Sequence, residues 1–278
     1  MSRISLCHYC ARKVILASVK VSTLLLIGSE VFGQSYPGLP SPERSDLQVS
    51  DPIQIRVTKQ RNAGSNVVTL QEIQHVVPSK AWKEMEKAEA ARLKNRTDDA
   101  ISHYLQAIAL DPEFVAARNN LAVVYFTTGI GDPGISQLEA AIKTDPHRPT
   151  VFTNLALGYT LIHQYEPAER AARVAVSLDR ADARPRLILG IALVAQQKST
   201  AEALQNFEEA GGTYQEAHLF AARVLMTEGQ LKRAKSEIQI YLSSAEQENR
   251  AVAMHWFDLI VQTEQKSVAS FLSPSPTN

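Results

Sequence analysis

The sequence predicts an all-α fold, a right-handed α-solenoid of about five helix-turn-helix repeats. The first observation is a fixed period of 34 residues, which moves Leu121 onto Leu155 and then onto Leu189. Self-similarity at a constant interval of this size is typical of a stacked repeat array. The second observation is that small residues recur where two helices would cross closely, as Ala122 and Ala156 do on the first helix of their repeats.

The residue pattern within each repeat predicts two helices separated by a short break. In the second repeat, apolar and small residues spaced three to four apart predict a first helix over Val115 to Thr128. Gly129 and Gly131 end it. Asp132 is predicted to be the N-cap of the second helix, Pro133 to Thr144, because aspartate is favoured at that position. Pro133 then occupies the first position of the helix, where proline is tolerated.

The repeat resembles the tetratricopeptide repeat over roughly Ala81 to Glu248. Three stretches carry the resemblance: Leu155-Ala156-x-x-Tyr159, Ala168-x-x-x-Ala172 and Leu189-Gly190. The chain departs from the family at the early tryptophan position, which holds Glu84, Arg118, Phe152, Arg186 and His218. The family's aromatic residue on the second helix survives only as Tyr104 and Phe207.

The first 33 residues resemble a secretory signal peptide. Basic residues precede an apolar run from Val14 to Ile27, and Val31-Phe32-Gly33 provides a cleavage site before Gln34. An uncleaved anchor is the alternative, but a run of 14 residues is shorter than the roughly 20 needed to span a bilayer. We expect a periplasmic or secreted protein, with membrane contact only through this segment if it is retained.

Residues 34–78 are expected to be a linker. Gln34 to Pro52 is rich in proline, serine and charge, which indicates a spacer. Ile53, Ile55 and Val57 alternate with polar residues, and together with residues 67–70 they predict a short β-like extension. Ser79 is expected to be the N-cap of the first repeat helix.

The array is assigned to residues 79–248, and two irregularities are expected within it. The first helix of the first repeat is unusually polar, which suits a repeat at the end of an array. In the fourth repeat one extra residue lies in the turn, and Gly211-Gly212 ends the second helix early. Residues 249–270 are expected to form an amphipathic capping helix that buries Val252, Trp256, Leu259 and Ile260, followed by a flexible tail over residues 271–278.

The sequence predicts no enzyme, catalytic residue, metal site or cofactor. Its seven histidines show no metal-ligand spacing, and both cysteines, Cys7 and Cys10, lie in the signal segment, so the mature chain would contain no thiol. Basic and acidic residues balance at 29 each, which gives no indication of a nucleic-acid partner.

The resemblance implies a concave groove lined by the first helix of each repeat. In each first helix, residues two, six, nine and thirteen share one stripe. The stripe members are Ala116, Asn120, Val123 and Thr127, then Thr150, Asn154, Leu157 and Leu161, then Arg184, Ile188, Ile191 and Ala195. The predicted partner groove consists of Asn119, Asn120, Val123, Phe126, Thr127, Thr150, Asn154, Leu157, Leu161, Arg184, Leu187 and Ile191.

Two functions are expected from this groove and its surroundings. The favoured one is an exported interaction module that holds a peptide or helix of another protein in the groove. The alternative is a structural subunit of a cell-envelope or secretion assembly, docked through its edges and N-terminal segment. Asn120 and Asn154 occupy the same place in consecutive repeats, so they are either parallel rungs for the backbone of a bound peptide or groups that hydrogen-bond within the array.

Overall fold

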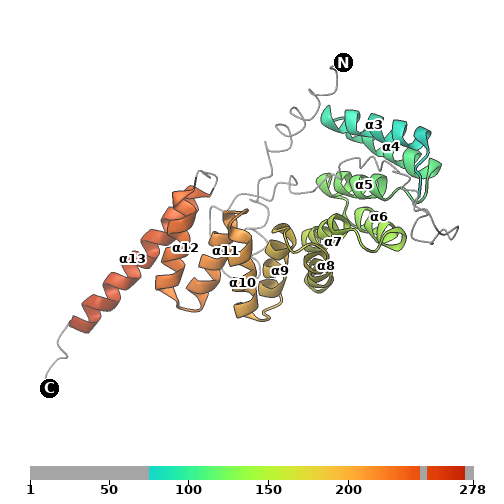
Figure 1. The fold of residues 1–278 in the computed structure, drawn as a ribbon. Helices are drawn as coiled ribbons and strands as arrows, with labels where there is room; N and C mark the ends of the chain where they lie inside the picture. The colour runs from blue at the N-terminus through green and yellow to red at the C-terminus, as the bar shows by residue number, and fades with distance from the viewer. Residues whose placement is uncertain (1–74, 245–248, 273–278) are drawn as a thin grey trace, which may run out of the picture. The chain divides into compact units, whose positions relative to one another are not determined.

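The computed structural model describes residues 75–244 and 249–272 of the 278-residue chain. Within these ranges the chain forms eleven α-helices and no strand (Figure 1). The predicted signal segment and β-like extension lie outside the described residues. The helices are α3 Ser79–Leu93, α4 Thr97–Leu110, α5 Val115–Thr127, α6 Gly131–Thr144, α7 Pro149–Leu161, α8 Tyr165–Leu178, α9 Arg184–Ala195, α10 Thr200–Gly211, α11 Glu216–Thr227, α12 Leu231–Ser243 and α13 Arg250–Leu272.

The helices group into two units, α3–α7 and α8–α13, which divide between Leu161 and Ile162. Within each unit every helix packs against the next one along the chain. The division falls inside the third predicted repeat, between its first helix, α7, and its second, α8. The predicted all-α helical-repeat architecture is confirmed.

The turn within each repeat has a left-handed residue that recurs with the sequence period. Asn95, Gly129, His163 and Gln197 have φ values of 56°, 83°, 60° and 54°, and they are spaced 34 residues apart. The second helix starts two residues after Gly129 but three residues after Gln197. That extra residue confirms the irregularity expected in the fourth repeat, and α10 is also shorter, with 12 residues against 14 in α6.

Two helix starts differ from the prediction. Ile130, not Asp132, is the N-cap of α6, and Pro78, not Ser79, is the N-cap of α3. Neither cap makes a side-chain hydrogen bond. The turn after left-handed Gly129 is so short that the helix begins at once, which places Asp132 in the first turn, where its negative charge suits the helix dipole.

Polar pairs replace the tryptophan that the family places early in the first helix. In three repeats the residue at this position bonds to a residue 19 places later, on the second helix. The pairs are Glu84 with His103 at 2.8 Å, Arg118 with Gln137 at 2.9 Å, and His218 with Glu237 at 2.7 Å. In these three repeats the two helices are therefore joined at this point by hydrogen bonds.

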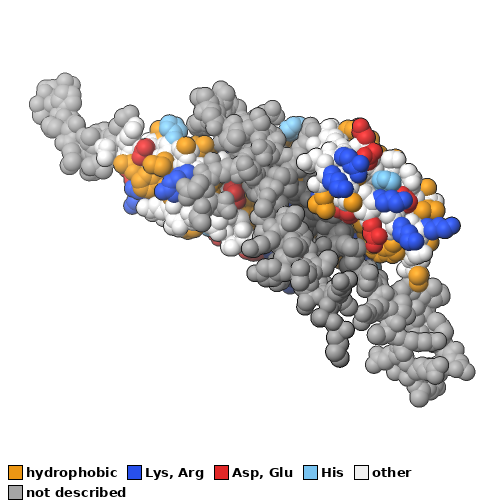
Figure 2. Space-filling view, turned by 90° about the horizontal axis from the view of Figure 1, so that it is seen from above, with side chains coloured by type: hydrophobic (Ala, Val, Ile, Leu, Met, Phe, Trp, Pro, Cys, Tyr) orange, Lys and Arg blue, Asp and Glu red, His pale blue; other side chains and the backbone are white. Residues whose placement is uncertain are grey.

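The two ends of the described array differ in character. The outer face of α3 is charged, as expected, with exposed Lys83, Glu86 and Lys87, and Figure 2 shows basic and acidic side chains intermixed over this first helix pair. At the other end α13 packs on α12 through Trp256 and Ile260. The expected burial of Leu259 is wrong, since this residue is 38% exposed. No described helix combines the length and apolar content needed to cross a membrane.

Candidate peptide-binding groove

Nine of the twelve predicted groove residues lie on two helices that contact each other, α5 and α7. We call these nine residues the groove face. Six are buried, namely Asn119, Asn120, Val123, Phe126, Asn154 and Leu157. Thr150 and Leu161, near the two ends of α7, are half-buried, and Thr127, at the end of α5, is exposed. The middle of the face is therefore covered while its ends remain accessible.

A chain of side-chain hydrogen bonds crosses the groove face. The amide nitrogen of Asn154 donates to Asn119 Oδ1 at 2.9 Å, and the amide nitrogen of Asn119 donates to Asn120 Oδ1 at 3.1 Å. The amide of Asn120 then donates to Glu89 Oε1 on α3 at 2.9 Å. First helices of three successive repeats are thus connected by buried polar groups, which are costly to bury unless they are hydrogen-bonded.

The chain ends on a carboxylate that two other groups hold in place. Glu89 accepts the hydroxyl proton of Tyr104 and pairs with Arg92 at 2.9 Å. Burial, together with the nearby Glu89 charge, raises the pKa of Tyr104, so this phenol stays a donor. With its partners fixed, Glu89 orients the amide of Asn120 and, through it, the rest of the amide chain.

The amide chain changes the interpretation of the two asparagines. Asn120 and Asn154 are linked to each other through Asn119, and each donates a hydrogen bond inside the array. Hydrogen bonding within the array, one of the two expected roles, is therefore observed, and a role as rungs for the backbone of a bound peptide stays a prediction. The sequence signal for this was the pair Asn119-Asn120, whose neighbouring side chains reach two different helices.

Phe126 is the member of the groove face that packs against two glycines. It is 2% exposed, and its ring contacts the backbones of Gly134 on α6 and Gly158 on α7. A Cβ atom added to Gly158 would lie 2.3 Å from Phe126 Cζ, and one added to Gly134 would lie 2.5 Å from Phe126 Cε1. The ring thus fills a gap that only two glycines leave open, and it holds α5 against both neighbours.

The other three predicted groove residues lie on α9, in the second unit. Leu187 and Ile191 are 1% and 4% exposed, and Arg184 is half-buried. The Nε of Arg184 donates to the Tyr214 hydroxyl at 3.2 Å, while its buried Nη1 has no hydrogen-bond partner among the described residues. This helix therefore presents an apolar stripe with one cationic group at its start.

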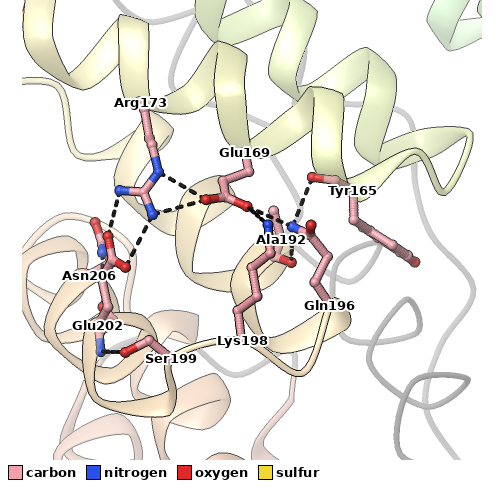
Figure 3. Close-up of polar contacts among 9 residues, drawn as sticks. All are labelled: Tyr165, Glu169, Arg173, Ala192, Gln196, Lys198, Ser199, Glu202 and Asn206. Atoms are coloured by element: carbon pink, nitrogen blue, oxygen red, sulfur yellow. Dashed lines mark hydrogen bonds and ion pairs between the residues drawn. The ribbon is translucent and has the colours of Figure 1, made fainter.

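A charged cluster in the second unit was not predicted from the sequence (Figure 3). Glu169 on α8 accepts from Lys198 at 2.8 Å and from Gln196 at 3.0 Å, both beyond the end of α9. Arg173 bridges Glu169 at 3.0 Å and Glu202 at 2.6 Å. Burial disfavours the charged form of Glu169, but the hydrogen bonds from Lys198, Arg173 and Gln196 outweigh it and lower the pKa of this carboxyl.

The cluster joins three helices and has a structural role. Its two carboxylates and two cations balance in charge, and together they tie α8 to the α9–α10 turn that contains the extra residue. The sequence does indicate the ion pair of Glu169 with Arg173, because residues four apart are neighbours on a helix. It does not indicate the contact of Lys198 with Glu169, because that contact depends on the conformation of the α9–α10 turn. Among the described residues, no group of three or more potential metal ligands lies close enough to hold an ion.

Comparisons with known proteins agree with this architecture. A family model described as the TPR repeat matches residues 88–129. The BBSome complex member BBS4 homolog of Drosophila melanogaster is 28% identical over 100 residues, which cover 36% of this chain and 21% of that protein. The chain therefore spans about a fifth of the length of this curated relative.

Solved structures share the fold at low sequence identity. The pilF protein of Pseudomonas aeruginosa is 19% identical with a TM-score of 0.58, and the match covers 69% of this chain and 88% of that one. The MamA protein is 18% identical with a TM-score of 0.51, and the match covers 70% of this chain and 98% of that one. The helix pairs, the 34-residue period and these matches show a helical-repeat fold, part of which is similar to the TPR repeat.

Proposed function

We propose that this protein is an exported, non-enzymatic interaction module, and that the groove face of α5 and α7 holds a peptide or helix of another protein. The single observation that supports the site most strongly is the buried amide chain, which runs through the middle of the groove face. The positions of α9 that correspond to Asn119 and Asn120 two repeats later hold Leu187 and Ile188. Helix stacking alone therefore does not require amides at these positions.

The chemistry of the face suits the backbone of a bound chain. An amide offers two N–H donors and a carbonyl acceptor, so a group that bonds within the array can also bond to a ligand. Because Glu89 and the neighbouring amides hold each asparagine in one orientation, little side-chain freedom would be lost on binding. Val123 and Leu157 supply apolar contact on the same face.

The proposal is tested by site-specific photo-crosslinking in the native cell. A photoreactive residue replaces Thr127 or Leu161, which are accessible members of the groove face, and Ser136 on the exposed side of α6 serves as the matched control. We expect one discrete partner band from the two groove positions and none from Ser136. Crosslinks that form equally at Ser136, or only outside the groove face, would contradict the proposal.

A second candidate function is a structural subunit of a larger assembly, and one observation favours it. The neighbouring helices α12 and α13 carry exposed apolar side chains, since Ile240, Met254 and Leu259 are 45%, 50% and 38% exposed. The curated relative is itself described as a member of a complex. A photoreactive residue at Met254 would give the partner band under this second function, and the groove positions would not.

A further inference from the structure

We propose that a hollow between α10 and the α11–α12 turn is a second binding site, which takes the lysine side chain of a partner protein. The hollow has a volume of about 370 Å³, toward the lower end of the roughly 300–1,000 Å³ that ligand pockets span. Its lining includes Leu204, Gln205, Glu208, Glu228, Gln230 and Arg233. All six residues belong to the second unit, so this site goes beyond the groove face of α5 and α7 and does not depend on it.

The hollow lies at the repeat position that the charged cluster of Figure 3 occupies one repeat earlier. The cluster joins α8 to the α9–α10 turn, and the hollow lies between α10 and the α11–α12 turn. The two turns correspond, because left-handed Gln197 and Gly229 are each the second residue after the end of the preceding helix. Counted from the helix ends, the matching positions are Glu169 and Leu204, Arg173 and Glu208, Gln196 and Glu228, Lys198 and Gln230, and Glu202 and Arg233.

The central ion pair of the cluster has no counterpart in the hollow. In the cluster, the ammonium of Lys198 reaches from the turn to Glu169 on α8 at 2.8 Å. The matching positions hold Leu204, which is 6% exposed, and Gln230, whose amide donates to Glu228 at 2.6 Å. The floor of the hollow is therefore aliphatic, and none of the residues that line it supplies an ammonium group.

The charge of the hollow is one cation short of the balance found in the cluster. The cluster has two carboxylates and two cations, whereas the hollow has the carboxylates of Glu208 and Glu228 and the single guanidinium of Arg233. Arg233 donates to Gln230 at 2.8 Å and lies 3.4 Å from Glu208. Glu228 forms no ion pair within the described ranges 75–244 and 249–272, and its side chain is exposed.

A lysine side chain supplies both missing parts. Its aliphatic stem can lie along Leu204 while its ammonium stays at the exposed rim beside Glu228. The ammonium is a compact point charge with three donors, which suits the separate carboxylates of Glu208 and Glu228 better than the planar fork of arginine does. Because the walls are exposed, the lysine can come from another protein.

Thiol protection on the full chain tests the inference with a defined probe. With Cys7→Ser and Cys10→Ser in place, Gln205→Cys puts the only thiol in the wall of the hollow. Its alkylation by neutral iodoacetamide is followed with and without a glycine pentapeptide that is blocked at both ends and has lysine at its centre. The matched control peptide has norleucine in place of lysine. A thiol introduced instead by Ser136→Cys on α6 shows whether the peptides act on any exposed thiol.

At about 10 mM, ten times a Kd of about 1 mM, the lysine peptide should slow alkylation about tenfold, and the norleucine peptide should leave it unchanged. Glu228→Gln should abolish the protection, because it removes the carboxylate that lacks a cation. Gln230→Lys should abolish the response to the peptide, because it supplies the ammonium from the turn itself, as Lys198 does one repeat earlier. Equal protection by both peptides, protection by neither, or protection that survives Glu228→Gln would overturn the inference.

A photoreactive residue at Gln205 in the native cell decides whether the lysine belongs to a partner protein. We expect a crosslinked partner whose contact segment contains a lysine, and we expect Gln230→Lys to remove this crosslink without changing the one formed at Thr127. A Gln205 crosslink that survives Gln230→Lys would overturn the inference. Protection by the lysine peptide without any crosslinked partner would assign the hollow to a free amine instead. Failure of the Thr127 and Leu161 crosslinks would contradict only the proposed function.

Discussion

The contact of Phe126 with two glycines provides a sharp test of how this array packs. Gly158→Ala adds a Cβ that would lie 2.3 Å from Phe126 Cζ, far inside normal contact distance. The ring cannot move away freely, because its adjacent Cδ1–Cε1 edge lies against Gly134. Overpacking costs about 1–3 kcal/mol, and alanine gains about 1 kcal/mol over glycine inside a helix. With the ring held on both sides the cost lies at the upper end, so a net loss of about 2 kcal/mol is expected.

Urea unfolding followed by circular dichroism measures this loss, and a shift of about 1 M in the midpoint corresponds to it. Gly212→Ala is the control, because no atom lies within 4 Å of its added Cβ and its φ of −64° is helical. This control should gain about 0.4–1 kcal/mol. Phe126→Leu should partly rescue Gly158→Ala, with a favourable coupling of about 1 kcal/mol. A Gly158→Ala variant as stable as the parent, or a double variant without coupling, would refute the packing described here.

Three further predictions concern charge, the amide chain and processing. Glu169→Gln should cost about 1–3 kcal/mol near neutral pH. The pKa of Glu169 is lowered in the folded state, so the stability that this carboxylate contributes is complete above its ordinary pKa of 4.5 and is lost as the pH falls through the lowered pKa. The urea midpoints of parent and variant should therefore converge in acid. A gap between the midpoints that stays constant with pH would contradict this. Asn119→Ala removes partners from both Asn120 and Asn154, so it should lower stability by about 1–3 kcal/mol in thermal unfolding, and an unchanged melting temperature would argue against the amide chain. N-terminal sequencing of the native protein should find Gln34 first, and recovery of Met1 would disprove cleavage.

Much of the architecture could be predicted because repeat helices are encoded locally. The residues that end each first helix, Asn95 and Gly129 among them, follow the 34-residue period, and the left-handed backbone recurs at those positions. The extra residue before Thr200 was visible as a shift of register. The helix starts were predicted less well, as at Asp132, because the position of a helix end depends on how tightly the preceding turn closes. The differences are only one or two residues.

The groove face could be predicted only in part. Its residues fall on α5 and α7 as expected, because helical periodicity decides which residues share a stripe. Periodicity does not decide what a side chain meets on a neighbouring repeat. Asn119 was expected to line the groove, and its hydrogen bonds to Asn120 and Asn154 could not be foreseen from the stripe. Phe126 was expected to line the groove, and its packing on glycines of two other helices could not be foreseen from the stripe.

The sequence by itself determined the number and order of the helix pairs, the positions of their turns and the stripe that each first helix presents. These follow from backbone preferences and spacing within a few residues. The tertiary structure alone decided the contacts between residues 15 to 35 positions apart: the hydrogen bond from Tyr104 to Glu89, the reach of Lys198 to Glu169 and the amide chain. Such contacts depend on the distance and rotation between packed helices, and these are set by the whole interface between them rather than by any one stretch of sequence.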